Sequence, residues 1–444
     1  MDTLIIIVQL LTSLSILVVL HEGGHFAAAK WFKTKVEKFY LFFNPWFSLL
    51  KFKRGETEYG IGWLPFGGYV KIAGMIDESF DKEQMKGEMQ PWEFRAKPAW
   101  QRLIIMLGGI IVNVILGVFL FIMIIWIYGS SFLPNDQVKD GIFVDDLGYE
   151  MGLRDGDKIL AVGDVAFDKF DPGKLKTGII LNDATTVLVE RNNAEQVIDI
   201  DPKYLSELSS YDKKDYMIFG PRIPFEIGTV AEGSIAEKAG IQLKDKIIAV
   251  NNQPAAFANE VQKLLKDKAS QEVLVTALRN GADTVDFAIT MDETGLLGIA
   301  PSSLDNYFTI EIEKFGLGQS IPMGFAKSYG FIADQVKAFG MIFSGKLKAK
   351  DSLGSVISIG KLYGTEWVWS RFWNITAMLS LLLAFLNLLP IPGLDGGHVV
   401  FVLWEMVTGR KPSDKFLEYA TMIGFVLLIG LMIFALGLDI MRLF

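Results

Sequence analysis

The chain contains three histidines, and two of them belong to the segment His21-Glu22-Gly23-Gly24-His25. On a helix, residues four apart lie on one face, roughly 6 Å apart along the axis. Two imidazoles at that spacing can hold one Zn²⁺ ion, and Glu22 can then act as general base on a water activated by the metal. The motif predicts a zinc site with hydrolytic chemistry. The alternative is a chance occurrence of the same residues in a polar helix.

The residues before the motif weaken that alternative. Residues 4–20 form an uncharged, apolar run that is typical of a membrane-spanning helix. At that depth two histidines and a glutamate cost several kcal/mol of free energy unless they have a partner or a function. The run does not resemble a cleavable signal peptide, because Asp2 precedes it and no basic residue does. We therefore expect the histidine pair to bind metal inside the membrane.

A third metal ligand is expected from a second apolar stretch, which ends in the segment 387–398. Pro390 and Pro392 lack backbone donors and break the helix there, and broken backbone at membrane depth is tolerated only inside protein or beside a wet cavity. Asp395 follows directly and is the expected third ligand, which leaves a fourth position for water. A helix cap or turn is the alternative role for Asp395. His398 is a further candidate ligand, but it lies further towards the cytoplasm and is expected to be peripheral.

Composition limits the class of protein. The chain has 444 residues, of which 51% are hydrophobic, so a membrane protein of several modules is expected. The formal net charge is −8 and no basic stripe appears, which argues against nucleic acid as a partner. There is no cysteine, so disulfides are excluded and a metal must be bound by histidine and carboxylate.

Four segments are apolar over the ~20 residues that a bilayer requires, namely residues 4–29, 103–128, 372–394 and 419–438. Lysine and arginine gather between the first two segments and between the last two, so both connections are expected on the cytoplasmic side. Both termini and the long stretch between the second and third segments then face the periplasm of a bacterial inner membrane. The histidine pair and Asp395 come at similar depth, towards the cytoplasmic side.

The two motifs together resemble those of the site-2 protease family of intramembrane zinc metalloproteases. That family has His-Glu-x-x-His in its first span and Asn-x-x-Pro-x-Pro-x-Leu-Asp-Gly in its third, and this chain matches every position. The resemblance covers the whole chain, since the four-span plan also fits. It implies that His21, His25 and Asp395 bind one zinc ion per chain and that Glu22 is the catalytic base. It also implies that Asn387 engages the substrate backbone.

Residues 58–75 interleave Gly60, Gly62, Gly67 and Gly68 with aromatic and β-branched residues, a pattern typical of short strands and tight turns. The segment is apolar but too interrupted to cross a membrane, so we expect a re-entrant hairpin near the metal site, as in the family. Such a hairpin could clamp an extended substrate by accepting it as an added strand. A cytoplasmic surface hairpin is the alternative. The residues expected to bind substrate are Gly67, Gly68 and Tyr69 here and Asn387, Pro390 and Pro392 in the third span.

An internal repeat occupies the long stretch between the second and third spans. The segment 152–162 recurs at 240–250 with the shared pattern Gly-[hydrophobic]-x-x-x-Asp-x-Ile-x-x-Val. This pattern resembles PDZ domains, especially those of bacterial envelope proteases, and we place two of them at 129–220 and 221–306. A PDZ groove can take a peptide as an added strand. The alternative is a bulky filter that admits only substrates whose outer domain has already been removed.

An amphipathic helix is expected after the repeat, within residues 307–371. Its apolar stripe follows helical spacing and consists of Phe325, Tyr329, Ile332, Val336, Phe339 and Phe343. The stripe suits either the outer membrane interface or packing against the PDZ pair.

The expected fold is an α-helical polytopic membrane protein with four transmembrane helices, a re-entrant β-hairpin and two inserted PDZ-like α+β domains. Its expected parts are residues 1–128, 129–220, 221–306, 307–371 and 372–444.

The expected function is that of an intramembrane zinc endopeptidase, which cuts single-span membrane proteins within the lipid bilayer. Family members with two PDZ domains regulate sigma-E in Gram-negative bacteria, which implies an anti-sigma factor, first trimmed by a separate protease, as substrate. Leftover signal peptides are a second implied substrate class. One alternative is a PDZ-bearing scaffold or chaperone with an inactive metal site. A metal transporter is the other, although the second span has only Asn113, and the fourth only Thr421, as polar residues that could line an ion route.

Overall fold

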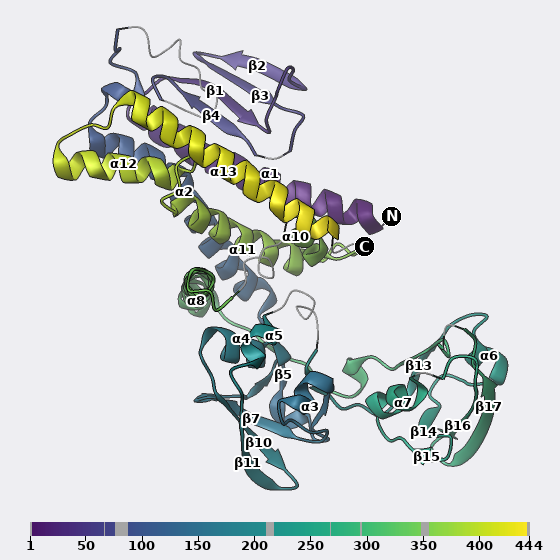
Figure 1. The fold of residues 1–444 in the computed structure, drawn as a ribbon. Helices are drawn as coiled ribbons and strands as arrows, with labels where there is room; N and C mark the ends of the chain where they lie inside the picture. Colours follow the sequence, from purple (N-terminus) through teal and green to yellow (C-terminus); the bar gives the residue numbers. More distant parts are fainter. Residues whose placement is uncertain are drawn as a thin grey trace. The chain divides into compact units, whose positions relative to one another are not determined.

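The structure is a computed structural model that divides into two compact units (Figure 1). The first unit contains residues 1–129 and 314–444, and the second contains residues 130–313. The long helices and a small sheet belong to the first unit, and most of the strands belong to the second. The residues that the structure describes are 2–65, 67–75, 88–209, 217–266, 268–293, 295–347 and 355–441.

Four helices among these residues are long and apolar enough to cross a membrane. They are α1 (Asp2–Trp31), α2 (Ala99–Tyr128), α11 (Trp369–Leu388) and α13 (Asp414–Met441), and they confirm the four apolar segments expected from the sequence. The third segment was expected to continue to residue 394, but α11 ends at Leu388. The reason is Pro390, because a proline disfavours helical backbone at the residue before it, and Leu389 is extended.

Helix α2 packs against both α1 and α11. Where α1 and α2 cross, a Cβ atom added to Gly24 would lie 2.2 Å from the backbone oxygen of Gly108. The two backbones therefore meet at a distance that only glycine permits. Further along α2, a Cβ atom added to Gly117 would lie 2.6 Å from Leu381 Cγ on α11. These contacts make α1, α2 and α11 one closely packed frame.

Helix α12 (Asp395–Thr408) is attached to this frame through an ion pair with α2. The Nη2 atom of Arg102 lies 2.5 Å from Glu405 Oε1, and the Arg102 side chain is almost fully buried. Arg102 also donates from Nε to the carbonyl oxygen of Lys97. Because an unpaired buried charge is costly, this pair strongly favours one position of α12 on α2.

Helix α13 is held at two points. Midway along it, a Cβ atom on Gly424 would overlap the backbone oxygen of Pro392, so α13 passes directly over the loop between α11 and α12. Near its end, the buried Asp439 accepts hydrogen bonds from the backbone N–H and hydroxyl groups of Ser355 and Ser358. These serines begin helix α10 (Val356–Tyr363). The bonds satisfy a carboxylate that would otherwise be costly to bury.

A four-stranded sheet follows α1 in the chain, with strand order β2-β3-β1-β4. Its strands are β1 (Val36–Leu41), β2 (Leu50–Arg54), β3 (Thr57–Ile61) and β4 (Tyr69–Ile72). The short strands expected within residues 58–75 are present as β3 and β4, but the expected hairpin is wrong. Both strands pair with β1 instead of with each other, β3 in parallel and β4 antiparallel, because β1 lies between them and offers both of its edges. Strand β1 was not predicted from the sequence. Phe66 lies outside the described residues.

Helix α8 (Leu317–Phe343) is the expected amphipathic helix, and it packs against α2 and α11 of the first unit. Its inner face uses small residues: a Cβ atom on Gly324 would lie 2.4 Å from Ile122 of α2. The expected apolar stripe is therefore divided. Ile332 and Phe339 pack inwards, Phe339 against Phe385 at 5.2 Å between ring centroids. The exposed members are Phe325, Tyr329, Val336 and Phe343.

The second unit contains two copies of one α+β arrangement, each around its own hydrophobic core. The first copy has a sheet ordered β11-β10-β7-β8, and the second has β17-β16-β14-β15. Among the described residues each copy also has a separate strand pair, β6 with β12 and β13 with β18, and β9 of the first copy pairs with β5. Strands β5 (Ser130–Pro134) and β19 (Glu311–Glu313) pair where the chain enters and leaves the unit.

The elements of the first copy are β6 (Ile142–Val144), α3 (Asp146–Glu150), β7 (Lys158–Val162), β8 (Val165–Ala166), β9 (Lys169–Phe170), α4 (Pro172–Leu181), β10 (Thr186–Arg191), β11 (Ala194–Asp199), α5 (Tyr204–Leu208) and β12 (Phe219–Pro221). Those of the second copy are β13 (Ile227–Val230), α6 (Ile235–Ala239), β14 (Lys246–Val250), β15 (Gln253–Pro254), α7 (Ala258–Leu265), β16 (Glu272–Arg279), β17 (Asp283–Thr290) and β18 (Ile299–Pro301).

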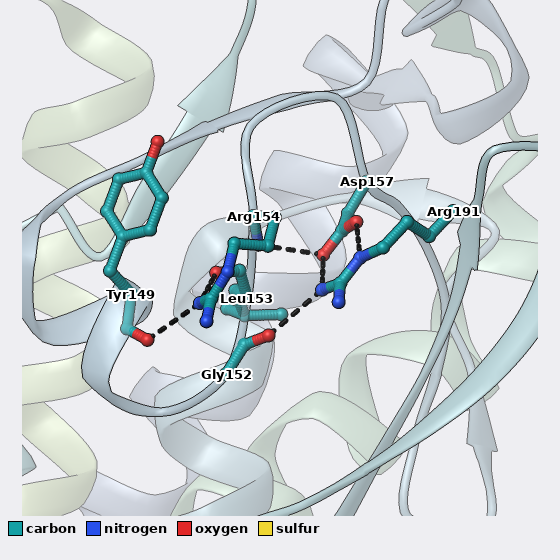
Figure 2. A network of polar contacts seen from close by, with 6 residues as sticks. All are labelled: Tyr149, Gly152, Leu153, Arg154, Asp157 and Arg191. Atoms are coloured by element: carbon teal, nitrogen blue, oxygen red, sulfur yellow. Dashed lines mark hydrogen bonds and ion pairs between the residues drawn. The ribbon is translucent and has the colours of Figure 1, made fainter.

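Each of the two copies contains an equivalent ion pair between a buried aspartate and an arginine. In the first, Asp157 accepts from both nitrogens of the Arg191 fork at 2.7 Å and from the backbone N–H of Arg154 (Figure 2). In the second, Asp245 accepts in the same way from Arg279 and from the backbone N–H of Gln242. Each arginine also donates to the carbonyl oxygen of a glycine that begins the repeated segment. The aspartate of the sequence repeat is thus explained by a structural role.

Candidate metal centre

The structure brings His21, His25 and Asp395 together at one end of α1. Asp395 Oδ2 lies 3.3 Å from the Nε2 atom of each histidine, and the two Nε2 atoms are 3.3 Å apart. Both histidines are buried. The helical spacing of the histidines places them on one face of α1, and the end of α11 at Leu388 lets the chain turn so that α12 begins with Asp395.

This triangle fits a zinc ion. Donor atoms about 2.0–2.1 Å from a tetrahedral ion lie about 3.3–3.4 Å apart, which matches the three separations. Asp395 Oδ2 is buried and has no hydrogen-bond partner among the described residues, so the atom is available for a cation. Two histidines and one carboxylate are also a typical set for a catalytic zinc site, which keeps its fourth position open.

Helix α2 supports both histidine rings from behind. His25 Nδ1 lies 2.8 Å from the carbonyl oxygen of Ile105, and His21 Nδ1 lies 3.0 Å from the amide nitrogen of Asn113. A Cβ atom on Gly109 would lie 2.5 Å from His25 Nε2, so the rings occupy space that any side chain at this position would fill. Such contacts orient the ligands of a metal site.

Sequence reasoning missed this role of α2. From the sequence, Asn113 is considered only as a polar residue that could line an ion route, although a buried amide in a membrane is itself a signal of function. For Gly109 the signal was absent, because a glycine in an apolar helix has many uses.

Glu22 lies beside the triangle, where α1 meets the sheet. The backbone of Val70 in β4 hydrogen-bonds to its carboxylate. Next to it, Gly68 touches α1 so closely that a Cβ atom would lie 2.6 Å from Val18 Cγ1 and 3.5 Å from Glu22 Cγ. The edge strand β4 therefore runs alongside the expected catalytic base.

A cavity of about 840 Å³ opens onto these groups. Its walls come from α1, the sheet, α11, α12 and α13, and they are mostly apolar. The strand β4 and the residues just before it form one wall, and α13 contributes Phe425, Leu428, Ile429 and Met432 to another. The cavity is therefore large enough for several residues of an extended peptide beside the three ligands.

The residues expected to bind substrate are divided between two places. Gly67, Gly68 and Tyr69 line the cavity, and so does Asn387, whose Nδ2 lies 3.2 Å from His21 Nε2. Pro390 and Pro392 lie in the loop between α11 and α12 and do not line it. Their role in substrate binding stays a prediction. His398 lines the cavity but is outside the group of three possible ligands.

Comparison with known proteins agrees with this geometry. Residues 9–431 match the model of Peptidase family M50, which is nearly the whole chain. The chain is 27% identical to the regulator of sigma-E protease RseP of Escherichia coli (strain K12), with 98% of both chains aligned. It is 26% identical to the regulator of sigma E protease of Haemophilus influenzae, with 97% of both chains aligned.

A further relative, from Neisseria meningitidis, bears the name of a zinc metalloprotease and is 29% identical over 96% of this chain and 97% of its own. Because the family match covers far more than half of the sequence, the chain belongs to peptidase family M50, the site-2 protease family, and is a zinc metalloprotease.

Proposed function

We propose that this protease cuts the membrane-spanning segments of single-span membrane proteins, with one zinc ion held by His21, His25 and Asp395. The observation that carries the proposal is the 3.3 Å triangle of their ligand atoms at the end of an apolar helix. A zinc ion bound there would supply Lewis-acid chemistry for peptide hydrolysis. The open side of the triangle faces a cavity that can take a peptide.

Glu22 is the proposed catalytic base. It takes a proton from the attacking water and then gives that proton to the leaving amine of the cut peptide bond. The backbone of Val70 in β4, at the opposite edge of the sheet from β2, lies against its carboxylate. Asn387, whose amide points into the same space, is placed to hold the substrate backbone.

Substrate is proposed to bind as an added strand on β4. A helical substrate hides its carbonyl groups, so the segment that is cut must first unwind. Strand β4 pairs only with β1 in the described sheet, so its other edge can donate and accept backbone hydrogen bonds. That edge lies along the cavity wall next to Glu22, through Gly67, Gly68 and Tyr69. In this proposal the sheet is re-entrant and lies at membrane depth.

The two copies in the second unit are proposed to be PDZ domains. The repeated sequence pattern, the matching strand orders and the shared ion pair support one common fold. Two uses follow for the pair. One is peptide capture by strand addition, and the other is a filter that excludes substrates with a large outer domain.

The proposed cellular setting is supported by the names of the relatives and by the distribution of charge. Two relatives are named as regulators of sigma-E, so an anti-sigma factor is the proposed substrate class, with leftover signal peptides as a second. Basic residues between the first two spans and between the last two support a cytoplasmic position for those connections, on the positive-inside rule. The termini and residues 130–313 are then periplasmic, and the metal centre lies towards the cytoplasm.

The test is zinc content and cleavage of a single-span substrate, measured on purified full-length protein. We expect one zinc ion per chain and a cut inside the spanning segment. Asp395→Asn should lose both zinc and cleavage, because it removes the charged ligand. His398→Ala, in the same cavity but outside the triangle, is the matched control and should retain both. Unchanged zinc and cleavage in Asp395→Asn would refute the proposed centre, and zinc without cleavage in wild type would favour a scaffold.

A further inference from the structure

Asn113 is a fully buried amide in the middle of the apolar helix α2. Its Nδ2 atom lies 3.0 Å from His21 Nδ1, while its Oδ1 atom is buried and has no hydrogen-bond partner among the described residues. A buried amide oxygen without a partner costs free energy, the more so inside a membrane. The position of the amide therefore needs an explanation.

The two histidines differ in what faces their second ring nitrogen. His25 Nδ1 faces the carbonyl oxygen of Ile105, which only accepts, so Nδ1 carries the proton and Nε2 keeps its lone pair for a metal. His21 Nδ1 faces the N–H of Asn113, which donates, and this orientation puts the ring proton on Nε2, although Asn387 Nδ2 lies 3.2 Å from that atom. A ring with a proton on Nε2 cannot bind metal through that atom.

A half-turn of the Asn113 amide removes this conflict. It exchanges Oδ1 and Nδ2, which have nearly the same shape, and puts the unpartnered oxygen against His21 Nδ1. His21 then carries its proton on Nδ1, as His25 does, and both Nε2 atoms are free for the same ion.

We propose that Asn113 is a positioning residue of the metal centre, whose Oδ1 accepts the Nδ1–H of His21 when metal is bound. The proposal rests on the function proposed above, since it requires His21 to be a ligand through Nε2. Asn113 does not touch substrate or metal. It acts through His21 by fixing both the protonated nitrogen and the direction of the ring.

The surroundings of Asn113 suit this role. Its backbone oxygen accepts a hydrogen bond from the Ser380 hydroxyl at 2.7 Å, which ties this turn of α2 to α11. Helix α11 also carries Asn387, on the other side of the His21 ring. One turn before Asn113, Gly109 leaves the space that the rings occupy. The backbone at Asn113 is thus held in place beside the His21 ring.

The first test compares zinc affinities of purified full-length variants by competition with a chelator. Asn113→Leu has a similar size but no acceptor, and it should bind zinc about 10- to 100-fold more weakly. Asn113→Asp keeps an acceptor and should bind at least as tightly as wild type. Thr376→Val is the control, because it removes a buried hydroxyl between α11 and α1 that contacts Ser13 and not His21. Its affinity should not change.

The second test is a spectrum of protein labelled with ¹⁵N in its three histidines. Zinc-loaded wild type should show two ring N–H signals protected from exchange, from His21 on Asn113 and from His25 on Ile105. Asn113→Leu should lose one of them, and Asn113→Asp should keep both. A merely structural role for Asn113 would not produce this pattern.

Equal zinc affinity in Asn113→Leu and wild type would overturn the proposal and leave the proposed function intact. An Asn113→Asp variant as weak as Asn113→Leu would also overturn it. Failure of wild type itself to hold zinc would refute the proposed function first, and this proposal with it.

Discussion

Gly24 of α1 and Gly108 of α2 touch backbone to backbone. Gly24 directly precedes His25, and Gly108 directly precedes Gly109, which has no side chain and so leaves room for the histidine rings. A Cβ atom on Gly24 would lie 2.2 Å from the Gly108 oxygen. The contact sets the distance between the helix that carries the histidines and the helix that supports them. The two glycines of the His-Glu-Gly-Gly-His motif are therefore expected to differ sharply in what they tolerate.

Gly24→Ala should destabilise the protein by about 1–3 kcal/mol or more, because a backbone atom blocks the new methyl group and the helices must separate. Gly23→Ala is the matched control: no atom lies within 4 Å of its added Cβ, and alanine favours a helix over glycine by up to about 1 kcal/mol. Thermal unfolding in detergent measures both. A Gly24→Ala protein as stable as Gly23→Ala would show that the crossing is looser than described.

The candidate metal ligands could be predicted from the sequence more fully than the structure around them. The structure brings His21, His25 and Asp395 together as predicted, and they could be picked out because ionisable groups are rare in apolar spans and their chemistry limits their roles. The four spans were equally visible, since membrane thickness fixes their length. The repeat in the second unit was visible in the aspartate and glycine positions, although the arginines that pair with Asp157 and Asp245 were not recognised.

Pairing of strands and support by neighbouring helices were not predictable in the same way. Strand β1 was missed because its polar residues hide the alternation of apolar and polar side chains that marks a strand. Without β1, residues of β3 and β4 were predicted to pair with each other as a hairpin. Strand partners depend on which edges meet in the fold, and no local pattern records that. The contact of Asn113 with His21 likewise depends on the rotation of α2 about its axis, which an apolar sequence leaves open.

Strand β4 gives a prediction about catalysis without loss of metal. In Gly68→Ala the new Cβ would lie 2.5 Å from the backbone carbonyl oxygen of Tyr40 and 2.6 Å from Val18 Cγ1. The start of β4 must therefore move away from α1 and Glu22. We expect cleavage to fall on the order of 100-fold, because a shift near 1 Å at a reacting centre has that effect. Zinc content should stay at the wild-type level.

The control for Gly68→Ala is Lys53→Ala, an exposed residue on the opposite edge strand β2. Its cleavage rate should equal that of wild type. Normal cleavage by Gly68→Ala would mean that the distance between β4 and Glu22 does not matter for the reaction.

The buried ion pair in the second copy predicts an acid-sensitive part of the second unit. Burial alone would raise the pKa of Asp245, but hydrogen bonds from Arg279 and from the Gln242 N–H lower this pKa below its ordinary value. Since the folded pKa is depressed, the stabilisation is present above about pH 4, the unfolded value, and is lost as pH falls through the folded pKa. Hydrogen exchange in residues 227–301 of the full chain should therefore accelerate in acid.

Asp245→Asn should remove this acid response and destabilise this copy at neutral pH, because it leaves the Arg279 charge without its partner. Asp164→Asn, at an exposed position, is the control and should change neither. Wild-type stability in Asp245→Asn would show that the pair is not important for the fold of this copy.

Cleavage by Glu22→Gln, with zinc measured on the same samples, tests the account most directly. Glutamine keeps the size and polarity of the side chain but cannot accept the proton of the attacking water. We predict that wild type cuts a single-span substrate, whereas Glu22→Gln retains the zinc ion and does not cut. Equal cleavage by the two proteins would contradict the account, because Glu22 would then have no part in the chemistry.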